Sequence, residues 1–150
     1  MMKKGFDVQN AVGHQIRRAQ QLAVAIFMDE TQGFDITPVQ FAILTTLLAE
    51  PGEDQVTLAG KVAFDAATSG SVIGRLEAKG CIRREADAGD KRRKLLWVTP
   101  AGEAVAQQMK RAVVKSQARI VSPLTALERE QFSALLAKLI AGHEADQTSV

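Results

Sequence analysis

The sequence contains a single cysteine, only four prolines and no apolar run long enough to cross a membrane. One cysteine excludes an internal disulfide and a cysteine-rich metal site. Because prolines are few and there is no long run of glycine or serine, we do not expect a large disordered region. The N-terminal residues Met1–Asp7 also lack the apolar segment of a secretory signal. We therefore expect a cytoplasmic protein that is kept reduced and has no membrane partner.

Motifs of enzymes and of bound metals are missing as well. The sequence has no nucleophile elbow, phosphate-binding P-loop, dinucleotide fingerprint or HExxH motif. Its two histidines, His14 and His143, lie far apart in the chain, and no Cys/His cluster can hold zinc. We therefore expect a protein that is not an enzyme and needs no cofactor or metal. The 150 residues, 46% of them apolar, suit one soluble domain with a sizeable core.

The net charge of +2 is too small to indicate a partner by itself, but the positive charge is unevenly distributed. Residues 75–94 hold eight cationic side chains against four acidic ones, whereas acidic residues outnumber basic ones after Pro123. A basic segment within a nearly neutral chain is typical of contact with nucleic acid. The eight cations are Arg75, Lys79, Arg83, Arg84, Lys91, Arg92, Arg93 and Lys94.

The centre of the chain predicts two short helices joined by a tight turn. We expect Thr57 to cap a helix that runs through Ala63, and Asp65 to cap a second helix over residues 65–79. Gly80 is a suitable end for the second helix. Two short helices in this arrangement form a helix–turn–helix unit.

A small β-hairpin is expected after these helices. Its first strand follows Gly80, its charged tip spans residues 87–94, and its second strand spans residues 95–98. The alternation in the second strand indicates that Trp97 belongs to the core, and Cys81 is expected to be a small buried hydrophobe. Together the units predict a winged helix–turn–helix, in which the second helix enters a DNA major groove and the tip reaches a minor groove.

The flanking segments predict longer helices. Apolar residues spaced by three and four indicate a helix over about residues 8–32, and Thr-Pro pairs at 37–38 and 99–100 indicate two further helix starts. The second of these helices should run to about residue 121, and a last helix from Thr125 should end near Gly142, before a frayed tail over residues 145–150. These helices carry more apolar surface than one small lobe can cover, which predicts a two-fold homodimer.

Four motifs along the chain resemble those of the MarR family of bacterial transcription regulators. Residues 37–44 (TPVQFAIL) resemble the family's T-x-x-Q-[FY]-x-x-L helix, and residues 76–80 (LEAKG) resemble its L-E-x-K-G helix ending. Residues 87–92 (DAGDKR) resemble the D-x-x-D-[RK]-R wing, and residues 98–102 (VTPAG) resemble the L-T-P-x-G start of the dimerisation helix. Each motif is weak by itself, but four in the family's order make the resemblance specific.

A finer resemblance is to members of the family that control degradation of aromatic acids. Residues 51–59 (PGEDQVTLA) and 65–70 (DAATSG) are similar to their segments P-G-I-D-Q-x-T-L-A and D-R-x-T-x-G. Ala66 stands where those relatives commonly carry arginine. This departure removes a candidate DNA contact, so an operator sequence cannot be carried over from the relatives.

The family resemblance implies a mainly α fold with a small β-hairpin wing, that is, a winged helix–turn–helix with N- and C-terminal dimerisation helices. Residues 1–150 would form one domain, with the DNA-binding lobe at about 36–99 and dimerisation helices at about 6–33 and 100–142. The implied function is a repressor that binds a pseudo-palindromic operator in double-stranded DNA and is released by a small, anionic aromatic effector. The alternative is a winged-helix protein-interaction module that does not bind DNA.

In the predicted recognition helix, Thr68 and Ser71 lie three residues apart and can bond base edges or phosphates. The alternative for these hydroxyls is a bond to the helix's own carbonyls. Ala67 permits close approach to the groove, which favours a contribution from DNA shape. Arg75, one turn beyond Ser71, suits a phosphate or is simply a solvated side chain.

Four residues of the wing have expected roles. The resemblance places Lys91 in the minor groove and Arg92 either at DNA or paired with an acid that braces the wing. Asp87 and Asp90 are expected to shape the turn. The following Arg93 and Lys94 are interpreted as residues that flank the strand.

The first helix carries the candidate effector site. His14 and Arg18 are four residues apart and can pair with the carboxylate of an aromatic ligand, as the family's effector pockets imply. The alternative is that they make surface or inter-subunit polar contacts. A thiol sensor is not expected, because redox-sensing relatives carry their cysteine in this helix and this chain has none there.

Overall fold

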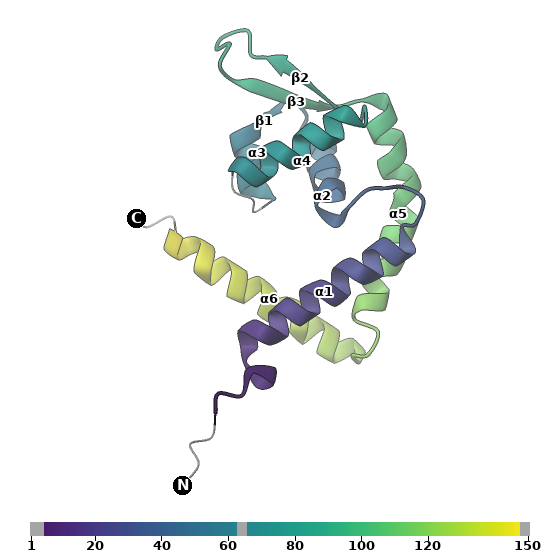
Figure 1. Ribbon diagram of the computed structural model, residues 1–150, viewed down its shortest axis with the longest axis vertical. Helices are drawn as coiled ribbons and strands as arrows, with labels where there is room; N and C mark the ends of the chain where they lie inside the picture. Colours follow the sequence, from purple (N-terminus) through teal and green to yellow (C-terminus); the bar gives the residue numbers. More distant parts are fainter. Residues whose placement is uncertain (1–4, 63–65, 148–150) are drawn as a thin grey trace.

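The computed structural model describes residues 5–62 and 66–147 (Figure 1). Its elements are η1 (Val8–Asn10), α1 (Val12–Glu30), α2 (Pro38–Ala49), β1 (Glu53–Asp54), α3 (Gln55–Lys61), α4 (Ala66–Ala78), β2 (Ile82–Ala86), β3 (Lys94–Val98), α5 (Pro100–Ile120) and α6 (Ala126–Gln147). Helices α2, α3 and α4 and the small sheet gather at one end of the molecule, and we call them the winged lobe. Helices α1 and α6 lie at the other end, and α5 connects the two groups. The predicted fold class, mainly helical with a small hairpin, is confirmed.

The two Thr-Pro pairs start helices as predicted. Thr37 accepts the backbone N–H of Gln40 at 3.2 Å, and the Gln40 side chain accepts the N–H of Thr37 at 3.0 Å. Thr99 caps α5 by accepting the N–H of Gly102 at 3.1 Å. The first N–H groups of a helix have no acceptor within the helix, and these bonds supply one. Because the capping threonine is only three residues away, a Thr-Pro pair predicts the helix start from sequence.

The first predicted helix, over residues 8–32, is not continuous. Ala11 has extended backbone between η1 and α1, and α1 ends two residues before the predicted end. Beside the interruption, the Asn10 amide donates to Asp7 at 2.6 Å, a local bond of the kind that competes with helix formation. The prediction was wrong because apolar spacing identifies a helix face but not where the backbone bonds begin.

Helix α3 begins earlier than predicted. Asp54 is its N-cap and accepts the N–H of Thr57 at 2.8 Å, so Thr57 is the third residue of the helix and not its cap. Both residue types are good caps, and the sequence pattern favoured the wrong one. Ala63 and Asp65, the predicted helix end and the predicted cap of the next helix, lie outside the described residues.

Of the predicted ends of two other helices, one was right and one was wrong. Helix α4 stops at Ala78, and Gly80 takes a φ of +74°, as predicted for a glycine that ends a helix. Helix α6 continues through Gly142, its predicted end, to Gln147. The predicted frayed tail is therefore helical over residues 145–147, since one glycine within a long helix costs only about 1 kcal/mol.

The sheet has the order β1-β3-β2 with antiparallel pairing. The hairpin was predicted and the two-residue β1 was not. Trp97 is half-buried, lies against Gly52 and has the Arg83 guanidinium 5.3 Å from its ring centroid. Cys81 is buried, as predicted. The fully buried large apolar side chains of the core are Ile36, Ile43, Leu44, Leu47, Leu58, Ile73, Leu76, Leu96 and Met109.

The first turn of α5 packs directly on the turn that follows α4, a contact that we call the junction. The Thr99 N–H donates to the carbonyl of Cys81 at 2.9 Å, and the Thr99 hydroxyl donates to the carbonyl of Gly80 at 2.5 Å. A Cβ on Gly102 would lie 2.2 Å from the Cys81 carbonyl oxygen and 2.9 Å from Cγ1 of Val98. Only glycine fits there, because the closest neighbour is backbone.

We expect Gly102→Ala to lower the free energy of unfolding by about 1–3 kcal/mol, because α5 must move away from the junction. Urea unfolding at one fixed protein concentration measures this. Gly74→Ala in α4 is the matched control, since a Cβ there would meet nothing within 4 Å beyond its chain neighbours and its own helix backbone. It should be neutral or stabilising by up to about 1 kcal/mol. Equal stability of the two variants would contradict the close contact.

Candidate nucleic-acid interface

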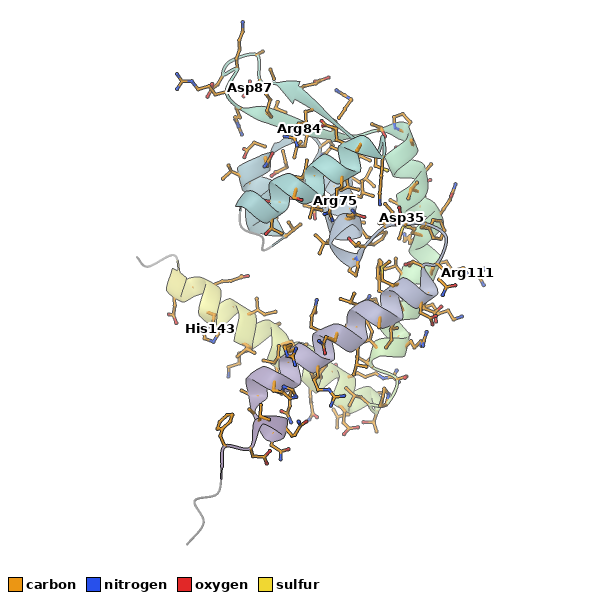
Figure 2. The ribbon with its side chains drawn as sticks, in the orientation of Figure 1. Asp35, Arg75, Arg84, Asp87, Arg111 and His143 are labelled. Carbon is orange, nitrogen blue, oxygen red and sulfur yellow. The ribbon has the colours of Figure 1, made fainter. Side chains whose placement is uncertain are left out.

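Helix α4 has a buried apolar side and an exposed polar side. Ile73 is fully buried, whereas Thr68, Ser71 and Arg75 are exposed at spacings of three and four residues. Such spacings place the three side chains on one side of a helix. Figure 2 labels Arg75 on this helix. Ala67 lies in the first turn of α4. The fold therefore brings three of the predicted DNA-facing side chains together on the outer surface of the winged lobe.

Residues 87–93 form the tip of the hairpin, which we call the wing tip. Asp87 and Asp90 each accept the backbone N–H two residues further on, at 3.0 Å. Short acidic side chains that make this bond favour a tight turn, in keeping with the turn-shaping role expected for both. Lys91 and Arg92 follow the turn and are exposed.

Among the described residues, the arginine of the wing tip that pairs with acids is Arg93. The expectation that Arg92 pairs with a bracing acid stays a prediction, because Asp65 lies outside the described residues. Arg93 donates from Nη2 to Oδ2 of Asp54 at 2.7 Å and from Nε to the same oxygen at 3.2 Å. Its Nη1 also lies 3.6 Å from Oδ2 of Asp87. Within residues 5–62 and 66–147, Arg92 has no acidic partner.

These contacts fix the charge state of Asp54. The bond from the Thr57 N–H, followed by the bond from Arg93, lowers the pKa of Asp54 to about 2. Asp54 in turn raises the pKa of Arg93 above the usual arginine value. The pair is therefore fully charged at every pH at which the protein is expected to act.

The eight cations of residues 75–94 divide into two groups. Four of them lie beside an acid, for example Arg84 Nε at 3.2 Å from Oε2 of Glu77. The other four have no acidic partner in the part of the chain that the structure describes, and they lie on α4 and around the wing tip. Positive charge that is left unpaired is available to phosphates. The paired cations are Lys79, Arg83, Arg84 and Arg93; the unpaired ones are Arg75, Lys91, Arg92 and Lys94.

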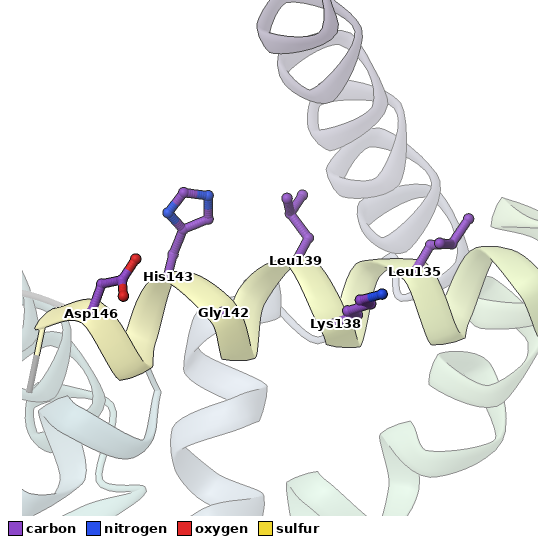
Figure 3. A pocket seen from close by; sticks show the side chains of 6 residues that line it. All are labelled: Leu135, Lys138, Leu139, Gly142, His143 and Asp146. Atoms are coloured by element: carbon purple, nitrogen blue, oxygen red, sulfur yellow. The ribbon is translucent and has the colours of Figure 1, made fainter.

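The candidate effector residues lie on α1, where His14 is half-buried and Arg18 is exposed. Neither lines the open hollow of about 500 Å³ that runs along α6 (Figure 3). That hollow includes His143, to which the sequence pattern assigned no role, because one histidine in a helix carries no signal by itself. Its lining residues are Leu135, Lys138, Leu139, Gly142, His143 and Asp146.

Neither a membrane span nor a metal cluster is present in the described residues. None of the helices in that part of the chain is long and apolar enough to cross a bilayer. No group of three or more His, Cys, Asp or Glu side chains there is placed to hold a metal ion.

Comparison with known proteins agrees with this geometry. The model of the MarR family matches residues 36–94, which include α2, α3, α4, β2 and the wing tip. The transcriptional regulator HosA of Escherichia coli O127:H6 is 32% identical over 133 residues, which are 89% of this chain and 97% of HosA. The repressor NicR of Pseudomonas putida is 30% identical over 139 residues, covering 93% of this chain and 88% of NicR.

Solved structures give the same result. PcaV of Streptomyces coelicolor, in complex with its natural ligand, superposes with a TM-score of 0.86 at 29% identity, over 93% of this chain and 98% of PcaV. BpsR of Bordetella bronchiseptica, whose DNA binding is regulated by 6-hydroxynicotinic acid, gives 0.84 at 30% identity, over 89% and 96%. The repressor CouR, bound to a 23-mer DNA duplex, gives 0.82 at 25% identity, over 93% and 99%.

The family assignment follows from these matches, because a relative more than 30% identical is covered almost entirely. Members of this family are transcriptional regulators and not enzymes. This protein belongs to the MarR family of transcriptional regulators.

Proposed function

We propose that this regulator is a cytoplasmic, homodimeric repressor that binds a near-palindromic operator and is released by a small anionic aromatic ligand. The observation that carries the DNA part is the placement of Arg75, Lys91 and Arg92, three exposed cations without acidic partners among the described residues. The relative CouR, similar over nearly its whole length, is bound to a DNA duplex. Helix α4 would enter a major groove and the wing tip the flanking minor groove.

The side chains of α4 indicate how the groove would be read. Thr68 and Ser71 offer hydroxyls to base edges or phosphates, and Ala67 allows the backbone to come close. None of these residues makes the two-bond contact with a base that arginine or asparagine makes. We therefore expect DNA shape and phosphate contacts to contribute much of the affinity. In a two-fold dimer, the half-sites would be centred about 10 bp apart.

The double variant Lys91→Ala/Arg92→Ala should bind the DNA duplex from beside its own gene about tenfold more weakly, or worse, at low salt. The dependence of log affinity on log salt should also become shallower, by about 0.9 for each phosphate that the variant no longer neutralises. Titration of the labelled duplex at several salt concentrations measures both quantities.

The control for this experiment is Lys110→Ala/Arg111→Ala, which removes the same charge from two exposed positions on α5, outside the winged lobe. Figure 2 labels Arg111. This control variant should leave the salt dependence nearly unchanged. Equal behaviour of the two double variants would contradict a role for the wing tip. A wild-type protein that binds this duplex no better than random DNA would favour the protein-interaction module instead.

The homodimer is supported by the apolar surface of α1 and α6. Every described side chain from 125 to 146 is exposed in the single chain, and contiguous apolar surface of this kind marks an interface. A second copy related by two-fold symmetry would cover it. The exposed large apolar residues of the two helices are Val12, Ile16, Leu22, Met28, Leu127, Phe132, Leu135, Leu136, Leu139 and Ile140.

We expect Leu135→Glu/Leu139→Glu to shift the protein from dimer to monomer, because two charges would be buried in the interface. Sedimentation velocity over a range of protein concentrations measures the shift. Val56→Glu is the control, since Val56 is 79% exposed but lies on α3. A double variant that sediments as the wild type would contradict this interface.

For the effector, we propose an aromatic carboxylate held by His14 and Arg18. The regulation of BpsR by 6-hydroxynicotinic acid supports this ligand class, and a carboxylate needs a cationic partner when it is withdrawn from water. Release requires that the ligand bind more tightly to the dimer conformation in which the spacing of the two winged lobes does not fit the operator.

Benzoate, 4-hydroxybenzoate or 6-hydroxynicotinate should weaken DNA binding in the titration described above, and benzyl alcohol, which lacks the carboxylate, should not. His14→Ala/Arg18→Ala should lose the response while it keeps the affinity for DNA measured without ligand. If all three acids leave the affinity unchanged, the proposed ligand class is wrong. If the variant responds as the wild type does, the two residues make other polar contacts.

A further inference from the structure

We propose that Arg93 is a positioning residue for DNA binding, because it connects the wing tip to the N-terminal end of α3 and so sets where Lys91 and Arg92 lie. The role in DNA binding rests on the proposed function, but the connection itself is a feature of the fold. It concerns Arg93 and Asp54, neither of which was assigned a role in DNA binding from the sequence.

The guanidinium of Arg93 contacts both ends of this connection. Two of its nitrogens lie 2.7 and 3.2 Å from Oδ2 of Asp54, which is 39 residues away in the chain. A third nitrogen lies 3.6 Å from Asp87, at the start of the wing tip. The backbone of Arg93 also closes the tip, because its carbonyl accepts the N–H of Asp87 at 2.9 Å. One side chain thus joins the two sides of the tip to a residue outside the hairpin.

Asp54 is held in place independently of Arg93. It is the N-cap of α3, and it accepts the N–H of Thr57 at 2.8 Å and the Thr57 hydroxyl at 2.9 Å. Its backbone pairs with Leu95 across β1 and β3, and its side chain is only 14% exposed. Because Asp54 is fixed at the base of α3, an arginine bound to it is fixed relative to the helix–turn–helix unit.

The backbone alone would leave the wing tip less well fixed. The pairing of β1 with β3 ends at Leu95, so β1 forms no backbone pair beyond that point toward the tip. The side chain of Arg93 extends the connection by two residues in that direction. Lys91 and Arg92 follow directly inside the tip, so a change at Arg93 moves or loosens these two cations.

A simpler role for Arg93 would be direct contact with a phosphate, because its side chain is 53% exposed. The two roles predict opposite results for Asp54→Asn. Removing this negative charge beside the interface should tighten binding if Arg93 only contacts DNA. It should weaken binding if Arg93 positions the wing tip. Asparagine caps helices about as well as aspartate does, so α3 should keep its start.

The experiment compares Asp54→Asn, Arg93→Gln and the double variant by titration with the duplex from beside the gene and with a random-sequence duplex. A partly exposed ion pair with two hydrogen bonds is of modest strength, so we expect each single variant to lose roughly three- to tenfold in affinity for the duplex from beside the gene. The double variant should be no weaker than either single variant, since all three break the same connection. Affinity for random DNA should not fall in Asp54→Asn.

The matched control is Lys94→Gln, which removes a neighbouring positive charge that has no acidic partner in the described chain. It should shift the affinities for both duplexes alike. The proposal is overturned if Asp54→Asn binds as tightly as the wild type or more tightly, while Arg93→Gln weakens binding to both duplexes with a shallower salt dependence.

Hydrogen exchange without DNA separates this proposal from the proposed function. Amides of the wing tip, including those of Asp87 and Arg93, should exchange severalfold faster in Asp54→Asn and in Arg93→Gln than in the wild type. Those of Lys94→Gln should not change. Faster exchange in a protein that does not bind DNA would keep the connection and refute the DNA-binding role of the protein. Unchanged exchange would refute the connection, whatever the affinity for DNA.

Discussion

The close approach at Gly102 is the constraint on which the arrangement of the molecule depends. The first turn of α5 lies so close to the carbonyl of Cys81 that only glycine fits, and Thr99 bonds the same turn with both its N–H and its hydroxyl. Helix α5 in turn packs along α1. The winged lobe is therefore held on the long helices at the C-terminal end of α4, and its orientation follows theirs. A displacement of α5 along its axis would carry the end of α4 with it.

A second contact also holds the C-terminal end of α4 in place. Lys79, just after α4, bonds the backbone carbonyl of Asp35 and lies 3.4 Å from its carboxylate, in the connection between α1 and α2. The end of α4 is thus joined to two segments. Lys79 contacts the connection that follows α1, and Gly80 and Cys81 contact Thr99 at the start of α5. The wing is held differently, through Asp54 and Arg93 at the start of α3. Helix α4 and the wing tip therefore have separate connections to their neighbours.

The sequence predicted a structural feature correctly where the residues that decide it lie close together in the chain. The Thr37 cap and the Gly80 helix end are decided within four residues, and both were predicted correctly. The choice between Asp54 and Thr57 as a cap also looks local, yet it depends on β1, which pairs with a strand roughly 40 residues away. The contact of Arg93 with Asp54 depends on the direction of the Arg93 side chain in the hairpin. A pattern of charges does not contain that direction.

The separate connections have a consequence for regulation under the proposed function. Under that proposal, a ligand that binds near α1 would change the spacing of the two α4 helices of the dimer through α5 and Lys79. It would not need to disturb the wing tip within either lobe. Each winged lobe would then keep its affinity for a single half-site, while the spacing of the two lobes would no longer match the spacing of the two half-sites. Without that match the gain from simultaneous binding disappears, which can amount to a factor of roughly 10² or more while every interaction inside a lobe stays intact. By linkage, a ligand that lowers the operator affinity by this factor must prefer the mismatched conformation of the dimer by at least the same factor.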